Sequence, residues 1–109
     1  MAKGEWKNDM LNGYAVVRYE NGDMYDGNFV NDKRHGYGVC TFSDGPDKKY
    51  EGYFEDGKFN GEGTLYFRNG GYYEGEFVDG KITGNGTKIS NGETQTGYFE
   101  DGVLKEDTE

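Results

Sequence analysis

Short runs in which the character of the residues alternates recur along the whole chain. The segments YEGYF at 50–54 and GTLYF at 63–67 are typical, and both are rich in aromatic or β-branched residues, as half-buried strands are. Such runs are closed by Asp-Gly or Asn-Gly, dipeptides that accept the positive φ angles of tight hairpin turns. No segment keeps an apolar period of 3.6 residues, so we expect no substantial helix. The pattern predicts an all-β protein built from β-hairpins.

The hairpins repeat at an interval of 22 to 25 residues. One position of the repeat is marked by Gly4, Gly27, Gly52, Gly75 and Gly97. A lone hairpin is marginal in water, so consecutive hairpins must pack side by side. We therefore predict a single array over residues 1–109, folded as an elongated single-layer antiparallel sheet. The repeats are expected near 2–24, 25–49, 50–72 and 73–94, followed by a partial repeat at 95–104 and an acidic tail at 105–109.

Strand alternation divides each first strand between two faces. Tyr50, Gly52 and Phe54 fall on one face, and Glu51 and Tyr53 on the other. The same parity holds in the runs that begin at 25 and 73. A glycine between two aromatic residues leaves room for a ring to lie over the backbone. The alternation predicts an aromatic face, and it leaves open which side of the second strand joins that face.

The motif Y-x-G-x-F, followed by a turn and G-x-G, resembles the MORN repeat (membrane occupation and recognition nexus). The resemblance covers nearly the whole chain: the repeats that begin at Tyr25, Tyr50 and Tyr73 match well, whereas Ala2 and Gln95 replace the tyrosine in the first and last. It implies a non-enzymatic scaffold that grips a helical or extended segment of a partner protein. Such arrays also occur beside catalytic domains such as SET-domain methyltransferases and phosphoinositide kinases, so a regulatory N-terminal array of a larger enzyme is an alternative.

We expect the partner to contact the aromatic face, because exposed contiguous aromatic surface is costly unless something binds it. The expected anchors are Trp6, Tyr25, Phe29, Tyr50, Phe54, Tyr73 and Phe77. Asp26, Glu51 and Glu74 form an acidic row that favours a basic partner. The parity puts these acids on the opposite face, where they would act at a rim or by long-range steering. Self-association through the ends of the array is a further expected contact.

Charge narrows the choice of partner. With 12 basic and 21 acidic residues the net charge is −9, which repels phosphate backbones, so nucleic acid is not expected to bind. Lys33, Lys58 and Lys81 occupy one turn position in successive repeats and would form a basic row that could contact lipid phosphate. Because acids accompany each lysine, we favour an exposed solubilising edge, and binding to anionic phospholipid is the weaker alternative.

The candidate reactive residues favour structural roles, and we expect no catalytic site, metal or cofactor. His35 precedes Gly36 and is expected in a turn, with no second histidine to share a metal. Cys40 is expected to be a small buried hydrophobe without a neighbouring cation. A single cysteine and the absence of signal-peptide features at the N-terminus favour the cytoplasm, in association with a membrane or the cytoskeleton as the resemblance implies.

Overall fold

Ten strands form one antiparallel sheet in which every strand pairs with its neighbours in the sequence. The computed structural model describes the backbone of residues 2–7 and 9–107 and the side chains of residues 9–105. The strands are β1 (Ala2–Lys7), β2 (Met10–Arg18), β3 (Met24–Val30), β4 (Lys33–Thr41), β5 (Asp47–Glu55), β6 (Lys58–Phe67), β7 (Tyr72–Val78), β8 (Lys81–Ser90), β9 (Glu93–Glu100) and β10 (Val103–Asp107). No helix occurs in the described residues, so the predicted all-β hairpin array is confirmed.

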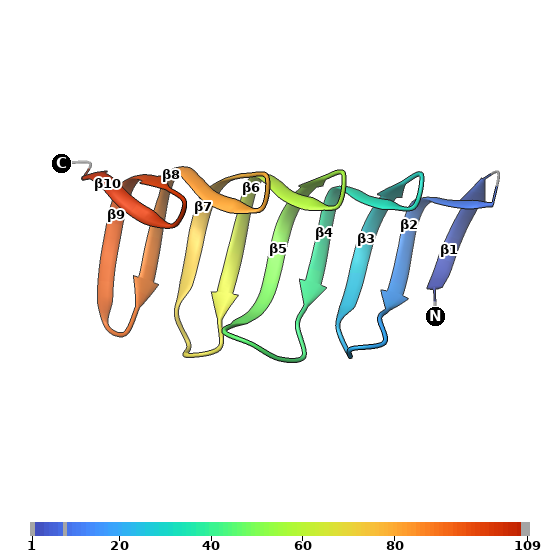
Figure 1. Cartoon of the computed structure of the whole chain (residues 1–109), viewed down its shortest axis with the longest axis horizontal. Coiled ribbons are helices and arrows are strands. Elements are labelled where there is room, and N and C mark those ends of the chain that lie inside the picture. Colours follow the sequence, from blue (N-terminus) through green and yellow to red (C-terminus); the bar gives the residue numbers. More distant parts are fainter. Residues whose placement is uncertain (1, 8, 108–109) are drawn as a thin grey trace.

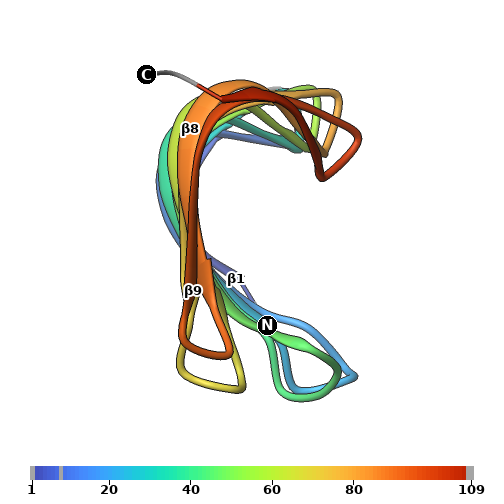
Figure 2. The same cartoon turned by 90° about the vertical axis from the view of Figure 1, so that its left-hand side faces the viewer.

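The sheet is a long, curved single layer. Its principal extents are 50 × 23 × 15 Å, and the strands lie side by side along the longest axis (Figure 1). Seen along that axis, each hairpin bends into a C, so the sheet has a concave and a convex side (Figure 2). We call the concave side the trough and the convex side the outer face.

Tight turns connect the two strands of each hairpin along one edge of the trough, which we call the rim. They lie at residues 31–32, 56–57, 79–80 and 101–102. Asp56 and Gly57 have φ angles of 50° and 86°, and two successive positive φ angles define the type I′ turn that suits a twisted hairpin. The Asp-Gly turns predicted from the sequence are therefore present.

The hairpins bend because the pairing across each rim turn contains an irregularity after the strand glycine. Between the pairs Gly52–Gly63 and Phe54–Phe59, Tyr53 of β5 lies opposite residues 60–62 of β6, so the extra residues are in the second strand. Such bulges bend a strand and free one backbone carbonyl from the ladder. The hydroxyl of Tyr50 donates a hydrogen bond to the carbonyl of Tyr53 at 2.8 Å. Equivalent bonds of 2.9 and 3.0 Å join Tyr25 to Asn28 and Tyr73 to Glu76. The motif tyrosine thus provides a hydrogen bond to the carbonyl that lies opposite the bulge of the second strand.

The rings of these tyrosines lie over pairs of glycines from facing strands. A Cβ atom placed on Gly52 would lie 2.5 Å from the Cα of Gly63 and 2.7 Å from the Tyr50 hydroxyl oxygen. Gly27 faces Gly38 and Gly75 faces Gly86 in the same arrangement. The predicted reason for glycine at this position, close approach of a ring to the backbone, is confirmed.

Edge-to-face contacts between rings join each repeat to the next. The ring centroids of Tyr25 and Phe54 are 5.1 Å apart, and those of Tyr50 and Phe77 are also 5.1 Å apart. The second strands complete this layer with Cys40 and Leu65, which are buried opposite Tyr25 and Tyr50. The buried layer, which we call the floor of the trough, comprises Leu11, Ala15, Tyr25, Phe29, Cys40, Tyr50, Phe54, Leu65, Tyr73, Phe77 and Phe99.

Candidate functional site

The aromatic residues expected to contact a partner form the floor of the trough instead of an open surface. Their exposed fractions lie between 0% and 4%, so the expectation of a contiguous exposed aromatic face is wrong for them; they are Tyr25, Phe29, Tyr50, Phe54, Tyr73 and Phe77. The rings shelter one another through the edge-to-face stack, and the glycine pairs bring the backbone close beneath them. Trp6 belongs to β1, whose side chains lie outside the described residues.

A second set of apolar side chains lies on the floor and remains accessible. Phe59 stacks flat on Tyr50, with ring centroids 3.9 Å apart and planes inclined by 7°. Phe67 and Ile82 are half-buried beside it, and Phe42 lies 6.3 Å from Phe59 between ring centroids. A hollow of about 520 Å³ opens among Phe59, Phe67 and Ile82. These second-strand residues, which we call the trough apolar surface, were missed from the sequence because the Y-x-G-x-F motif lies in the first strands.

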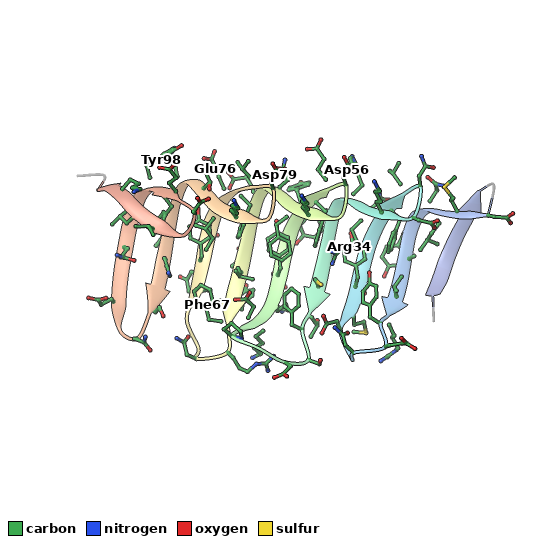
Figure 3. The ribbon with its side chains drawn as sticks, in the orientation of Figure 1. Arg34, Asp56, Phe67, Glu76, Asp79 and Tyr98 are labelled. Carbon is green, nitrogen blue, oxygen red and sulfur yellow. The ribbon has the colours of Figure 1, made fainter. Side chains whose placement is uncertain are left out.

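Two cations also lie in the trough. The Arg34 guanidinium lies 5.8 Å from the ring centre of Tyr25 and 5.2 Å from that of Phe54. Its Nη2 donates to the carbonyl of Gly57 at 2.6 Å, and its Nη1 lies 3.5 Å from the sulfur of Cys40. The ammonium of Lys88 lies 5.8 Å from the ring centre of Phe67. Figure 3 shows Arg34 and Phe67 below the rim.

The expectation that Cys40 has no neighbouring cation is wrong, because Arg34 lies beside it. The thiol is buried, as predicted, but a cation does lie next to it. Burial raises the pKa of Cys40 and the charge of Arg34 opposes that rise, with burial the larger effect. The thiol form is therefore favoured, and the structure gives no support for a reactive thiolate.

The acids predicted as a row lie on the outer face, as the alternation indicated. Glu51 forms an ion pair with Lys49, whose nitrogen is 3.0 Å away and lies 5.1 Å from the ring centre of Tyr66. Asp26 accepts a hydrogen bond from the hydroxyl of Tyr14, and Glu74 is exposed. These carboxylates therefore point away from the trough, and their role in binding a partner stays a prediction.

A family model for the MORN repeat matches this chain four times, at residues 3–24, 25–46, 50–72 and 73–94. The chain belongs to the MORN-repeat family. Three of the matches begin at the motif tyrosines Tyr25, Tyr50 and Tyr73. MORN repeats are modules that interact with proteins or lipids, so this array is expected to work through one of its surfaces.

The lysine row of the MORN array follows the rim, but acids accompany it. Lys33, Lys58 and Lys81 are exposed at the first positions of β4, β6 and β8. Lys81 lies 3.9 Å from the carboxylate of Asp101 in the next rim turn. Figure 3 shows Asp56 and Asp79 along the same edge. The rim thus carries charges of both signs.

The histidine predicted in a turn lies in a strand. His35 lies in β4 and not in a turn, because β4 begins two residues earlier, immediately after the rim turn. Its carbonyl accepts a hydrogen bond from the side chain of Asn28.

No group of three potential metal ligands occurs among the described residues. No helix in this part of the chain is long and apolar enough to cross a membrane. β1 and β10 form the two edges of the sheet, and self-association through them stays a prediction.

Proposed function

We propose that this MORN array is a non-enzymatic scaffold that binds a segment of a partner protein along its trough. The observation that carries the proposal is the trough apolar surface. Phe59, Phe67 and Ile82 remain half-exposed above a floor whose own packing is complete. Contiguous apolar surface of this kind marks a binding site in a soluble protein.

The shape of the trough supports a long, narrow occupant. The concave side of the sheet extends across the strands along the 50 Å axis of the molecule (Figure 2), and the hollow of about 520 Å³ opens in it. A helix with its side chains is about 10–12 Å wide, and an extended segment is narrower. The rings of the floor pack against one another, and a preformed surface of this kind reduces the entropy lost on binding. Either a helical or an extended segment therefore fits the proposal.

Binding to anionic phospholipid is the second candidate, and the rim lysines favour it. The strength of such binding rises with the number of basic residues near the membrane surface. Here the rim turns place Asp56, Asp79 and Asp101 beside the lysines, and the chain carries a net charge of −9. Repulsion by these acids makes a protein partner the better-supported occupant. A cytoplasmic site of action is part of the same proposal.

The proposal can be tested with a library of random 20-residue peptides displayed on phage and selected on the intact protein. Affinities of selected peptides are then measured for Phe67→Ala and for Tyr53→Ala, a matched loss of one ring from the outer face. Because binding energy concentrates in aromatic anchors, we expect Phe67→Ala to weaken binding by about 2 kcal/mol, roughly 30-fold. Tyr53→Ala should change affinity by less than about twofold.

Melting curves of both variants control for unfolding. Loss of binding from Tyr53→Ala with none from Phe67→Ala would move the binding surface to the outer face. Vesicles of phosphatidylcholine with and without phosphatidylserine test the second candidate. Binding that requires phosphatidylserine, combined with selection of no trough-dependent peptide, would replace the protein partner with a lipid surface.

A further inference from the structure

Arg34 interrupts an apolar row of the trough. In each hairpin, the second residue after the rim turn faces the aromatic residue that ends the motif, as Phe59 faces Phe54 and Ile82 faces Phe77. This position is apolar in the other repeats, where it is occupied by Leu11, Phe59, Ile82 and Leu104. Only here, opposite Phe29, is it a cation. The rings beneath Arg34 hold its guanidinium at the floor, half-buried.

Lys88 interrupts a second apolar row, which lies six residues further along the second strands than the row of Arg34. It faces Tyr73, and the corresponding partners of Tyr50 and Tyr25 are Leu65 and Cys40. The row therefore runs from Cys40 through Leu65 to Lys88. The ammonium of Lys88 is half-buried and lies near Phe67, a residue of the trough apolar surface. Charged residues thus replace apolar ones twice, both times on the trough side.

Neither cation has a carboxylate partner within 4 Å in the described residues, although other lysines do. Lys49 pairs with Glu51 on the outer face and Lys81 with Asp101 at the rim. Arg34 lowers the pKa of Asp23, but its charge acts more weakly on that carboxylate than the hydrogen bonds from Ser43 and Asn21 do. The oxygens of Asp23 already accept hydrogen bonds from Ser43 and Asn21. A half-buried cation without a carboxylate partner gains strongly from a charge-assisted hydrogen bond.

We infer that the segment held in the trough carries carboxylate side chains at two points, one paired with Arg34 and one with Lys88, on either side of its apolar contacts. This inference rests on the proposed function and adds the charge of the partner to it. It reverses, for the trough, the basic partner expected from Asp26, Glu51 and Glu74, since those acids lie on the outer face. Asp47 and Asp101 also border the hollow near Phe67, so the trough is not uniformly basic and the pairing is local.

The two cations also set a spacing for the carboxylates. Arg34 lies in β4 and Lys88 in β8, four strands apart. At about 4.8 Å between strands, the two positions are separated by about 19 Å along the trough. A helix rises about 1.5 Å per residue, so carboxylates on one helical face would be about 11–14 residues apart. An extended segment would place them about six residues apart.

The experiment repeats the peptide selection on the wild type, Arg34→Leu and Lys88→Leu. Leucine occupies the same rows at Leu11 and Leu65, so both replacements fit the local packing. We expect peptides selected on the wild type to be enriched in Asp and Glu at one of the two spacings. Each variant should bind these peptides about 10- to 30-fold more weakly. Lys58→Leu at the rim is the matched control and should change affinity by less than about twofold.

Substitutions in the peptide keep the test independent of the folding of the variants. Replacing one acid of a selected peptide by its amide should weaken binding to the wild type about tenfold and have little effect on the variant that lacks the paired cation. Peptides without acid enrichment that bind Arg34→Leu and Lys88→Leu as well as the wild type, yet still lose affinity on Phe67→Ala, would overturn the inference alone. Selection of no peptide that depends on Phe67 would overturn the proposed function and this inference with it.

Discussion

Tyr50 and Tyr53 belong to the same five-residue motif, yet one is fully buried in the trough and the other is 49% exposed on the outer face. Tyr50 lies over the Gly52–Gly63 pair and donates its hydroxyl to the carbonyl of Tyr53. The Tyr53 ring makes a single edge-to-face contact, with Tyr37, at 5.5 Å between centroids. Within one repeat, Tyr50 thus helps to build the sheet, whereas Tyr53 is left accessible for other contacts.

The two faces differ in charge as well as in packing. The outer face carries the acids at positions 26, 51 and 74, whereas the trough holds Arg34 and Lys88 against aromatic rings. The net charge of −9 is therefore a poor guide to the charges inside the trough. A partner selected by the trough need not be basic, although the overall charge would suggest it.

Alkaline pH should have the largest effect, because it ionises the buried tyrosines of the trough floor and so unfolds the sheet. Burial raises the pKa of Tyr25 and Tyr73 to about 12, and it raises that of Tyr50 as well. The unfolded chain has tyrosine pKa values near 10, so the folded protein holds these protons more tightly. Stability is therefore complete below about pH 10 and is lost as the pH rises through 12. The raised pKa values of Tyr25 and Tyr73 correspond to about 3 kcal/mol each.

Unfolding monitored by circular dichroism, together with tyrosinate absorbance, checks this prediction. The three floor tyrosines should ionise together with the unfolding of the sheet. A sheet that stays folded while these three tyrosines ionise would contradict the role given to the floor.

Gly52→Val should cause the next largest loss. A branched side chain here meets the backbone of Gly63 and Glu62 as well as the Tyr50 hydroxyl, and backbone atoms cannot move aside cheaply. We expect a loss of about 3 kcal/mol in the free energy of unfolding, at the upper end for overpacking. Thr64→Val on the outer face is the control and should change stability by less than about 0.5 kcal/mol. Equal denaturation midpoints for the two variants would show that Gly52 is not needed for close approach.

Removing one hydroxyl from each face compares them directly. Tyr50→Phe leaves the carbonyl of Tyr53, which lies opposite the bulge, without its hydrogen bond, at a cost of about 1–2 kcal/mol. Tyr53→Phe removes a hydroxyl with no such partner, so the change should be within about 0.5 kcal/mol. Urea denaturation of both variants measures the difference, and a similar loss in each would argue against the hydroxyl as the support of the bulge.

The repeat could be predicted closely because its signals are local. The spacing of the glycines, the Asp-Gly turns and the parity of Y-x-G-x-F each depend on residues near one another in the chain, and each matches the structure. The bulge at residues 60–62 gave no such signal, because extra residues in one strand are visible only when two strands are paired. His35 was misplaced for a related reason, since the rim turn ends at Asp32 and β4 begins earlier than the G-x-G suggested.

The candidate site was predicted less well, because burial depends on contacts between repeats. Phe54 looked like an exposed anchor within its own strand, but Tyr25 and Tyr50 from two different hairpins cover it. An alignment of the second strands of the repeats is the signal that would have predicted Phe67 and Lys88. Such an alignment shows Lys88 where Leu65 and Cys40 stand in earlier repeats.

The smallest effect is expected where the two faces meet, at the rim. Lys81 and Asp101 are each about two-thirds exposed and 3.9 Å apart, and exposed ion pairs of this kind contribute about 0–1 kcal/mol. Lys58→Glu combined with Lys81→Glu should therefore lower the free energy of unfolding by no more than about 1 kcal/mol. The affinity of a trough peptide should change by less than about threefold, since both lysines are solvent-exposed, although Lys81 borders the hollow beside Phe67. Phosphatidylserine vesicles in low salt provide the opposing measurement, because lipid binding would depend on these lysines. A large loss of peptide binding in the double variant, with its melting temperature retained, would place the working surface on the rim and remove the distinction between trough and outer face as the basis of recognition.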